Sequence, residues 1–403
     1  MDAKPIYIVC TPYFPTPESW RGPFCYDFVR ALLRTGKYDV WVFKPERGED
    51  YEYNGIRVYR FQGRSTICGF FPYLVAGANR RLFMEKAARV GVDWRRVAVF
   101  HAHEGYLLPL TAAIKAANPA VKIACHFHSM GHPFHVRGSR LGLLPVLSTL
   151  VYCYNRNRRE QVEYPVYVSE RQRSMMGRWY PNGFLNPPED LRLKLWFGRW
   201  CRTIRMRPSY VLYNGIDRSV FNPTGRVPHD GQFVIGDVAN FGDSKDQITL
   251  IRAIERLRGE IPGLKCRLVG SGPELVRCHD YVADANLGDI VEFIPEMDHL
   301  QLPDFYRSLD LFVSPSWAEG FCCTFMEAVG CGTPIMGCMG VSVDEAIMPD
   351  EHHLWLFAPQ NVDELVKKIL YFYRNRPKQH LTQDFDIDRL VPRFLDWLNR
   401  GEV

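Results

Sequence analysis

Two glutamates, Glu319 and Glu327, lie eight residues apart in a segment that runs from a predicted strand into a predicted helix. The apolar run 309–314 predicts the strand, and we expect the helix to begin near Cys322–Thr324. A helix start presents free backbone N–H groups and the positive end of the helix dipole, which together favour a phosphate group. Glu327, about one turn inside the helix, could accept hydrogen bonds from a ribose diol, and Glu319 could meet a sugar beyond the diphosphate. The segment therefore predicts a nucleotide-sugar site.

Four histidines stand at the ends of two predicted strands in the first half of the chain, as the pairs His101/His103 and His126/His128. Alternate residues on a strand share a face, so two such pairs on neighbouring strands could form a metal site. No cysteine or carboxylate signature accompanies them in the sequence, so we favour another interpretation. We expect His126 to be structural.

Short apolar runs alternate with helical periodicity along the chain, a pattern typical of parallel sheets covered by helices on both faces. The prediction is an α/β protein of two doubly wound halves. The expected strands are 5–10, 38–43, 97–102, 122–126 and 166–168 in the first half, and 233–238, 266–269, 289–294, 309–314 and 333–336 in the second. Helices are expected at 24–35 and 245–258, and an apolar helical face at 387–399 is interrupted by Pro392. We expect domains at 1–211 and 212–380, and a terminal helical segment at 381–403.

Length and composition fit this division. The chain has 403 residues, 46% of them hydrophobic and 24% charged, which is enough for two buried cores. The net charge of +5 is too small to indicate a nucleic-acid partner. No apolar run approaches the roughly 20 residues of a membrane span. The amino terminus has no secretory signal pattern, so we expect a cytoplasmic protein whose 12 cysteines are reduced and mostly buried.

A basic and aromatic stretch, 191–207, lies between the two halves. It contains Trp196, Phe197 and Trp200 among arginines and has no acidic residue. Three interpretations remain open: a solvated helix face, an acceptor-binding surface, or a patch that lies on an anionic membrane. The last predicts peripheral attachment at the inner membrane face.

The motif E-G-F-x5-E followed by A-x-x-C-G-T-P, at 319–334, resembles the nucleotide-binding half of the family-4 retaining glycosyltransferases (glycosyl transferases group 1). The segments VLYNGIDRSVFNP, VANFGDSKDQITLIRAI and RLVGSGPE resemble other parts of that half. FHAHEGYLLPLTAAI, IACHFHSMG and YPVYVSERQRSM match the first half more loosely. The resemblance covers nearly the whole chain and is strongest over 211–375. It implies the GT-B fold: two Rossmann-like domains facing a central cleft, with a C-terminal helix that crosses back onto the first domain.

The resemblance also implies a role for individual residues. Lys245 would neutralise the leaving diphosphate, and Gly22 would allow a close approach of backbone to phosphate. Backbone N–H groups of 321–323 would contact the sugar and the diphosphate. His128 matches the family's histidine at the end of a first-domain strand and would face the donor sugar. The catalytic candidates are Glu319, His128 and Lys245. The donor-binding candidates are Gly22, Arg21, Asn240, Lys245, Gly272, Phe321, Cys322, Cys323 and Glu327. The candidates on the acceptor or membrane side are His103, Trp196 and Trp200. Family members need no cofactor and generally no metal, so we expect none here.

The chain departs from the family at one important point. The family usually pairs the loop lysine with an arginine a few residues earlier, but the stretch 239–245 contains no arginine. A lysine is a point charge without the two-pronged geometry of a guanidinium. Three consequences are open: another basic residue replaces the arginine, with Arg21 as a candidate; donor binding is weaker; or catalysis has been lost.

The expected activity is transfer of a sugar from a nucleotide diphosphate sugar to a hydroxyl acceptor, with retention of anomeric configuration. UDP-sugar is the expected donor on family frequency. A lipid-linked or polysaccharide glycan is the expected acceptor. Two alternatives stay open: a catalytically silent homologue that binds a nucleotide sugar or glycan, and a nucleotide-sugar epimerase of the same fold.

Overall fold

The computed structural model describes residues 3–19, 22–63, 75–128, 162–179, 208–226 and 231–401, with the backbone alone at Tyr106 and 175–179. The chain divides into two compact units. Unit 1 contains Met1–Tyr213 and Asp388–Val403, and unit 2 contains Asn214–Ile387. Arg21, Trp196, Trp200 and the whole basic-aromatic stretch 191–207 lie outside the described residues.

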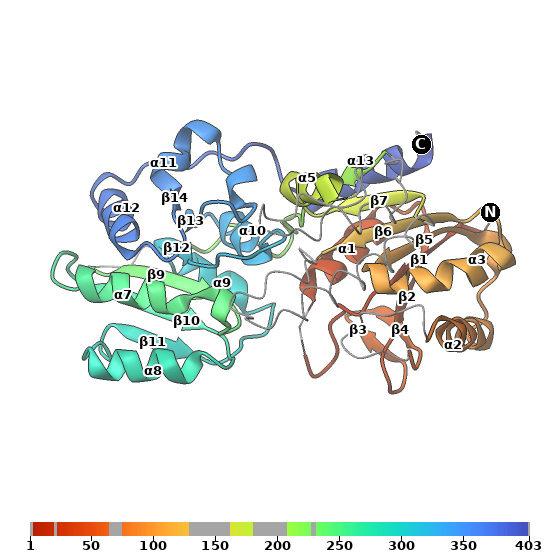
Figure 1. Ribbon diagram of the computed structural model, residues 1–403, viewed down its shortest axis with the longest axis horizontal. Coiled ribbons are helices and arrows are strands. Elements are labelled where there is room, and N and C mark those ends of the chain that lie inside the picture. Colours follow the sequence, from red (N-terminus) through yellow and green to blue (C-terminus); the bar gives the residue numbers. More distant parts are fainter. Residues whose placement is uncertain are drawn as a thin grey trace, which may run out of the picture. The chain divides into compact units, whose positions relative to one another are not determined.

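Unit 1 is built on a sheet with the strand order β3-β4-β2-β1-β5-β6-β7-β8 (Figure 1). All neighbouring strands are parallel except β3 and β4, which are antiparallel. The strands are β1 (Ile6–Cys10), β2 (Asp39–Lys44), β3 (Tyr51–Tyr53), β4 (Ile56–Arg60), β5 (Val97–His103), β6 (Lys122–Phe127), β7 (Tyr164–Tyr167) and β8 (Tyr210–Val211). The helices are α1 (Pro23–Arg34), α2 (Ala76–Arg89), α3 (Thr111–Ala117), α5 (Glu170–Trp179) and α13 (Ile387–Arg400).

The hairpin of β3 and β4 was not predicted from the sequence, although its turn carries a strong signal. Asn54 and Gly55 both have positive φ values, 46° and 78°. A two-residue Asn-Gly turn of this kind matches the twist of antiparallel strands. These two strands contain no apolar run, because they are half-exposed and their residues are largely polar or aromatic.

Unit 2 is built on a wholly parallel sheet with the order β11-β10-β9-β12-β13-β14. Its strands are β9 (Phe233–Val238), β10 (Leu264–Val269), β11 (Val291–Ile294), β12 (Leu311–Ser314), β13 (Ile335–Cys338) and β14 (Leu356–Phe357). Its helices are α7 (Gln247–Leu257), α8 (Leu275–Asp284), α9 (Leu302–Arg307), α10 (Cys323–Gly330), α11 (His352–Trp355) and α12 (Val362–Asn375). Helix α7 packs against α8 and α12, and α9 packs against α10. Figure 1 shows helices on both faces of this sheet.

Both sheets confirm the predicted doubly wound α/β class. In each one the chain builds outward from a central strand, then returns to the other side of that strand and builds the opposite way. The reversal lies between β1 and β5 in unit 1 and between β9 and β12 in unit 2. In such sheets, ligands bind outside the carboxyl ends of the strands at the reversal point. The central strands β1 and β9 are buried along their whole length, as parallel sheets covered on both faces require.

One predicted helix boundary is wrong in a place that matters for the site. The sequence predicted a helix from residue 245, but α7 begins at Gln247, and Lys245 ends a short 3₁₀ turn, Asp243–Lys245. Asp246 separates the two with a left-handed backbone (φ 51°), and its carboxylate accepts a hydrogen bond of 2.7 Å from the Thr249 hydroxyl. Lys245 therefore extends from a loop, not from a helix face.

The C-terminal helix α13 packs within unit 1. Phe394 lies against the rings of Phe28, His101 and Tyr210. The Lys122 ammonium donates to the carbonyl of Leu398 at 2.8 Å. Pro392 lies inside the helix, where it removes one backbone hydrogen bond without ending it.

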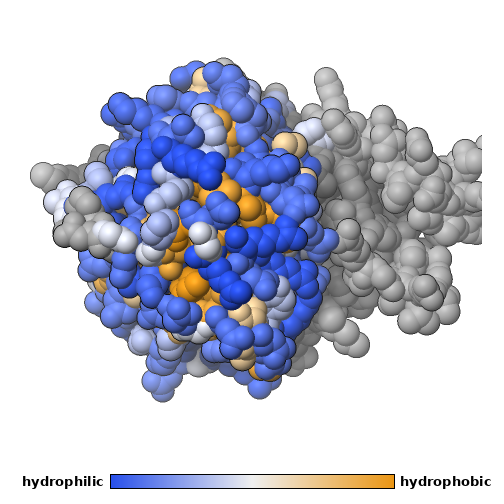
Figure 2. Space-filling model, turned by 90° about the vertical axis from the view of Figure 1, so that its left-hand side faces the viewer, coloured by the Kyte–Doolittle hydropathy of each residue, from blue (hydrophilic) through white to orange (hydrophobic). Residues whose placement is uncertain are grey.

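One end of unit 2 shows small apolar areas broken up by hydrophilic side chains (Figure 2). Among the described residues of this unit, the most exposed large apolar side chain is Val276, at 68%. No helix among the described residues is both long enough and apolar enough to cross a membrane. The cysteines that the structure describes are all free, and most are buried.

Candidate functional site

Two loops meet at the reversal point of the unit 2 sheet. The loop after β9 carries the turn Asp243–Lys245, and the loop after β12 carries Ser316, Trp317 and Glu319. The backbone N–H of Trp317 donates to the carbonyl of Ser244 at 3.0 Å, and its indole N–H donates to the carbonyl of Asp243 at 3.2 Å. These bonds hold the two loops together at the place where the topology predicts a ligand.

Lys245 and Glu319 form an ion pair between these loops. The Ser316 hydroxyl lies 2.7 Å from the same carboxylate oxygen, Glu319 Oε1. The Lys245 side chain is 26% exposed and that of Glu319 is 14% exposed, so both can still reach a ligand. Burial alone would lower the pKa of Lys245, but the charges of Glu319, Cys322 and Asp237 outweigh it and raise that pKa above its ordinary value. Lys245 is thus a permanent cation.

Asp237 is an acidic residue inside the fully buried strand β9, and the sequence analysis missed it. Neither carboxylate oxygen makes a hydrogen bond of normal geometry among the described residues, although Gln247 and the N–H of Val238 lie close enough to act on its charge. Burial raises the pKa of Asp237 to about 7, against the opposing effect of Lys245. An acidic residue in an otherwise apolar strand is the sequence feature that could have identified Asp237 as a candidate.

Helix α10 begins where it was predicted, at Cys323 with Cys322 as its N-cap. A thiol is only a weak hydrogen-bond acceptor and is a poor cap for the first turn, which also contains no acidic residue. An anionic ligand would supply the missing acceptors. The side chain of Asn214, also missed from the sequence, donates to the carbonyl of Phe321 at 3.0 Å and to the sulfur of Cys323 at 3.2 Å, which fixes the entry to the helix.

Glu327 lies inside α10 and is more enclosed than the sequence suggested, at 6% exposure. Its Oε2 accepts a hydrogen bond of 2.6 Å from the hydroxyl of Tyr306, and its Oε1 lies 3.8 Å from Nδ1 of His299. Burial and the neighbouring Glu327 raise the pKa of Tyr306 well above its ordinary value, so the phenol stays a donor. Glu327 therefore already recognises one hydroxyl, which is the chemistry expected of it toward a ribose.

The glycine turn after β10 lies against the loop after β9. Gly272 has a φ of 152°, and a Cβ placed on it would lie 2.4 Å from the carbonyl oxygen of Phe241. The N–H of Phe241 donates to the carbonyl of Ser271 at 2.9 Å. Asn240, the exposed residue before Phe241, belongs to this loop. The turn thus supports the loop that presents Lys245.

In unit 1, the candidate residues also gather at the reversal point. Gly22 precedes α1 with a φ of 88°, and a Cβ on it would lie 2.4 Å from the carbonyl oxygen of Tyr13. The ring of His128 packs against the rings of Phe24 and Tyr13, with centroids 4.6 and 6.0 Å away. Glu104, at the end of β5, accepts bonds of 3.4 Å from the His128 N–H and from the Tyr13 hydroxyl.

Glu104 was missed from the sequence and has an unusual backbone. Its φ is 108°, a region that costs a residue with a side chain roughly 1–3 kcal/mol. Backbone strain of this kind collects at functional sites, where the surrounding structure holds it in place. Glu104 contacts His128 through the bond to its N–H, so the strain lies directly beside the predicted sugar-facing residue.

The two H-x-H pairs lie side by side, as the sequence suggested. His103 pairs with His126 in the register of β5 and β6. Nδ1 of His103 lies 2.9 Å from Nε2 of His128 and 3.2 Å from the sulfur of Cys25 on α1. No sequence signature linked Cys25 to the histidines, because it lies 78 residues from His103 in the chain. Burial lowers the pKa of each of these histidines, that of His126 to about 3.

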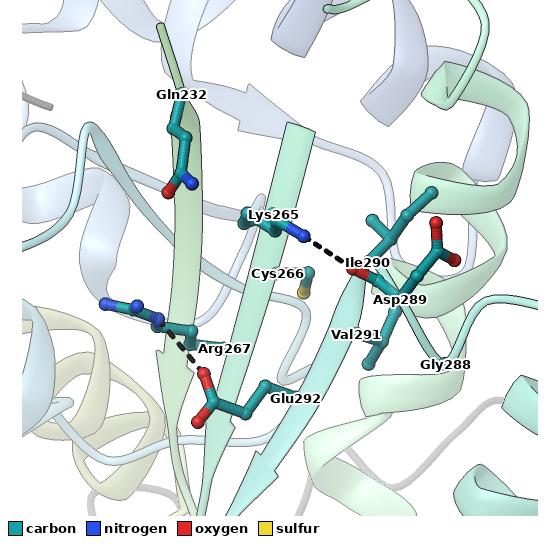
Figure 3. Close-up of a pocket in the computed structure, with 9 residues that line it drawn as sticks. All are labelled: Gln232, Lys265, Cys266, Arg267, Gly288, Asp289, Ile290, Val291 and Glu292. Carbon is teal, nitrogen blue, oxygen red and sulfur yellow. Dashed lines mark hydrogen bonds and ion pairs between the residues drawn. The ribbon is translucent and has the colours of Figure 1, made fainter. Parts of the chain in front are cut away.

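A separate hollow of about 250 Å³ lies on unit 2 beside β10 and β11 (Figure 3). Its charged groups pair with each other and with backbone: the Lys265 ammonium donates to the carbonyl of Asp289 at 2.6 Å, and Arg267 pairs with Glu292 at 3.1 Å. Gln232, Lys265 and Val291 stand at the amino ends of their strands, away from the reversal point. The hollow is not a candidate active site.

The structure thus brings Lys245 and Glu319 into contact and places the other unit 2 candidates on the elements around them. Gly22, His103 and His128 gather in unit 1. The roles predicted for these residues, and the expected central cleft between the two units, stay predictions. Arg21, the candidate to replace the missing arginine, lies outside the described residues.

Residues 224–384 match the family model of glycosyl transferases group 1. Among curated relatives, a D-inositol 3-phosphate glycosyltransferase of Mycobacteroides abscessus is 30% identical over 139 residues, which cover 31% of this chain and 30% of the relative. The lipopolysaccharide core biosynthesis mannosyltransferase LpsB of Rhizobium meliloti is 32% identical over 112 residues, or 27% of this chain and 31% of the relative. The matched segments therefore span about a third of these relatives.

Similarity to solved structures extends over nearly the whole chain. Sucrose-phosphate synthase of Thermosynechococcus elongatus matches with a TM-score of 0.69 and 18% identity, over 98% of this chain and 94% of that one. HepE of Anabaena, solved in complex with UDP, matches with a TM-score of 0.66 and 17% identity, over 98% and 100%. These likenesses show the fold, which is the two-unit GT-B architecture expected from the sequence.

Proposed function

We propose that this protein is a glycosyltransferase, because residues 224–384 match the family model of glycosyl transferases group 1 and the chain has the GT-B fold. It transfers a sugar from a nucleotide diphosphate sugar to a hydroxyl acceptor, with retention of configuration. The observation that carries this proposal is the pairing of Lys245 with Glu319 at the reversal point of the unit 2 sheet, beside the uncapped start of α10. A cation, a sugar-binding carboxylate and a phosphate-binding helix start are the three groups that a diphosphate sugar requires.

The Lys245–Glu319 ion pair suggests how the donor binds. A diphosphate has more negative charge than one carboxylate, so it would draw the Lys245 ammonium away from Glu319. Glu319 would then be free to accept hydrogen bonds from the sugar hydroxyls. In this arrangement the ion pair holds both side chains in place until the donor replaces it, which lowers the cost of organising the site on binding.

Lys245 supplies the main electrostatic help to the reaction in this proposal. Charge accumulates on the diphosphate as the bond to the sugar breaks, and a cation positioned there stabilises it. Asp237 is enclosed within β9, and Glu319 is assigned to the sugar hydroxyls, so neither is proposed as a covalent nucleophile. We therefore favour attack of the acceptor on the same face from which the diphosphate leaves, which retains the configuration.

UDP-sugar is the favoured donor, because HepE, a structural neighbour, has been solved with UDP. The acceptor is proposed to be a glycan or a lipid-linked sugar, since the relatives named above include an enzyme of lipopolysaccharide core synthesis. The acceptor would approach from unit 1, where His103 and His128 lie. Attachment to an anionic membrane through the stretch 191–207 remains part of the proposal.

Release of UDP from a panel of UDP-sugars, with candidate acceptors, tests the activity directly. Glu319→Gln and Lys245→Ala should each lower turnover by about 10²–10³, the loss typical of removing one group that stabilises the transition state. Glu292→Gln is the matched control, because it removes a carboxylate from another ion pair of the same unit, at the hollow away from the site. Turnover of this control should equal that of the wild type.

A thermal-shift screen with UDP-, GDP- and ADP-sugars separates binding from catalysis. A ligand present at 100 times its Kd stabilises the folded protein by about 2.7 kcal/mol. A shift without turnover would support the silent homologue that the missing arginine suggests. Product formation from donor alone would support an epimerase. If no nucleotide sugar shifts the unfolding temperature, the donor-site proposal is wrong.

A further inference from the structure

The histidine cluster of unit 1 contains more buried nitrogen than the proposed reaction uses. His101, His103 and His126 are 0%, 1% and 3% exposed. His101 Nε2, His103 Nε2 and both ring nitrogens of His126 make no hydrogen bond of normal geometry among the described residues, although the main chain of Leu212 lies near His126. Buried polar atoms in native proteins nearly always have a partner, and one that lacks it calls for a bound water or ion.

The fold directs these three side chains to one place. His101 and His103 are alternate residues of β5 and therefore share a face of the sheet. His126 is the direct neighbour of His103 across the parallel pair of β5 and β6, so it lies on the same face. One ring nitrogen from each of the three lies within 4.8 Å of the others. Three imidazoles are the protein ligands of three-histidine zinc sites, in which a water molecule fills the fourth position.

The opposite edges of two of these rings are held by other groups. Nδ1 of His101 lies 2.8 Å from the hydroxyl of Tyr7, and Nδ1 of His103 lies between Cys25 and His128. In metal sites, a histidine usually bonds a second protein group through the nitrogen that does not bind the metal, which fixes the orientation of the ring. These contacts at Nδ1 leave Nε2 of His101 and Nε2 of His103 available. Both atoms make no hydrogen bond of normal geometry among the described residues.

A second group of possible ligands, Cys25, His103 and His128, is a weaker candidate. The sulfur of Cys25 and the Nε2 of His128 already contact Nδ1 of His103, so hydrogen bonds account for this trio. The trio of His101, His103 and His126 has no such explanation. The two groups share His103, which would join them through its two nitrogens.

We propose that His101, His103 and His126 bind one divalent transition-metal ion, with Zn²⁺ as the favoured species. Imidazole nitrogen suits Zn²⁺, Cu²⁺ and Ni²⁺, whereas Mg²⁺ and Ca²⁺ require oxygen ligands, and this trio contains none. The ion would tie the carboxyl end of β5 to that of β6. Its role is structural: by holding His103 it fixes the bond from Nδ1 of His103 to Nε2 of His128, the residue expected to face the donor sugar.

The metal content of the full-length wild-type protein decides the question without any variant. Protein produced with Zn²⁺ in the medium, then dialysed, should retain about one Zn²⁺ per chain by elemental analysis. Removal of the ion with a strong chelator should lower the thermal unfolding temperature, and added Zn²⁺ should restore it. Reconstitution with Co²⁺ should give the visible absorption of cobalt bound to nitrogen in tetrahedral geometry. Wild-type protein that retains no transition metal and shows no cobalt spectrum would overturn the proposal, and the cluster would then hold water.

Variants assign the ligands. His101→Gln and His126→Gln should each reduce the bound zinc to less than a tenth of the wild-type content. His299→Gln is the matched control, because His299 is an equally buried histidine in unit 2 and should retain the full content. Zinc that survives both His101→Gln and His126→Gln would contradict the assignment, and if it were lost in Cys25→Ser it would belong to the other trio. These measurements do not depend on turnover, so they stay informative if the proposed activity is absent.

Discussion

Three charges at the end of β9 depend on one another: the buried carboxylate of Asp237, the ammonium of Lys245 and the carboxylate of Glu319. Lys245 attracts both acids, yet only Glu319 contacts it directly. Asp237 is fully buried and has no direct contact with a cation among the described residues, which is why burial raises its pKa to about 7 from its usual 3.8. The charge beside the proposed donor site therefore changes in the physiological pH range.

Asp237→Asn should change how stability depends on pH. The folded chain holds a proton on Asp237 up to about pH 7, whereas the unfolded chain releases it near 3.8. The folded state therefore binds an extra proton between these values, and the stability of the wild type falls as pH rises through this window. A shift of about three pKa units corresponds to at most about 4 kcal/mol.

Denaturant unfolding of both proteins at several values between pH 5 and pH 8 measures this effect. The unfolding free energy of the variant should rise relative to that of the wild type as pH rises. This difference should level off above pH 7. Asp243→Asn, which changes an exposed carboxylate of the adjacent turn, serves as the control and should follow the wild-type profile. A constant difference between Asp237→Asn and wild type at all pH values would show that Asp237 does not titrate in this window.

Tyr306→Phe tests how strongly the enclosed Glu327 depends on the hydroxyl of Tyr306. The change removes the 2.6 Å hydrogen bond to a buried carboxylate oxygen, which should cost about 1–3 kcal/mol of unfolding free energy. Tyr281→Phe is a close control, because Tyr281 donates to Glu255 at the same distance of 2.6 Å near the surface. Water replaces that donor, so its loss should cost less than about 0.5 kcal/mol. Equal losses in chemical denaturation would contradict the assigned burial of Glu327.

At the scale of the elements, the loops beyond the strand ends decide where the candidate residues lie. Gly272 allows the turn after β10 to press against Phe241, and Phe241 in turn belongs to the loop that leads to Lys245. A side chain at Gly272 must move that loop, since the obstructing atom is a backbone carbonyl. The turn therefore acts on the site although it contributes no charge to it.

Gly272→Ala should lower the unfolding free energy by roughly 1–3 kcal/mol, through its positive φ and the clash with Phe241. It should also weaken donor binding, measured by the thermal shift with UDP-sugar, because Lys245 is displaced. Gly242→Ala is the control: it lies in the same loop, has a φ of −118°, and has open space around its Cβ. If both variants behave alike, the close contact between the two loops does not matter for the site.

The elements were more predictable than the contacts between them. The pattern of apolar residues located β9 to the residue and the start of α10 within one residue, because both depend on local sequence. It could not show that Lys245 meets Glu319 across 74 positions, or that Cys25 meets His103 across 78. These contacts arise from the order of strands in the sheet, which is set by packing along the whole unit. Asp237 and Glu104 were missed for a related reason, since a buried charge and a strained backbone acquire meaning only from their surroundings.

At the scale of the whole molecule, the chain crosses between the units twice, after Tyr213 and after Ile387. The second crossing sends α13 back to complete unit 1, where its apolar face is buried. Leu395 and Leu398 are fully buried there, as is Phe394. Unit 1 is therefore built from two separate segments of the chain, whereas unit 2 is continuous in sequence.

Phe394→Ala should therefore destabilise unit 1 and leave unit 2 unchanged. Truncation of a buried phenylalanine costs about 3–5 kcal/mol, and here it removes contacts with Phe28, His101 and Tyr210. Hydrogen exchange measured by mass spectrometry should show faster exchange in β1, β5 and β6, with β9 and β12 at the wild-type rate. Leu365→Ala, at an equally buried position of α12, should give the reverse pattern.

Equal acceleration of both sheets by either variant would mean that the chain unfolds as a single cooperative body. The expected pattern follows from the division of contacts, because exchange from a core strand requires the opening of the unit that contains it. It also bears on the proposed function. UDP-sugar should slow exchange in β9 and β12, and because His128 is expected to face the donor sugar, it should also slow exchange at the carboxyl end of β6. Protection confined to β9 and β12 would argue against that role of His128.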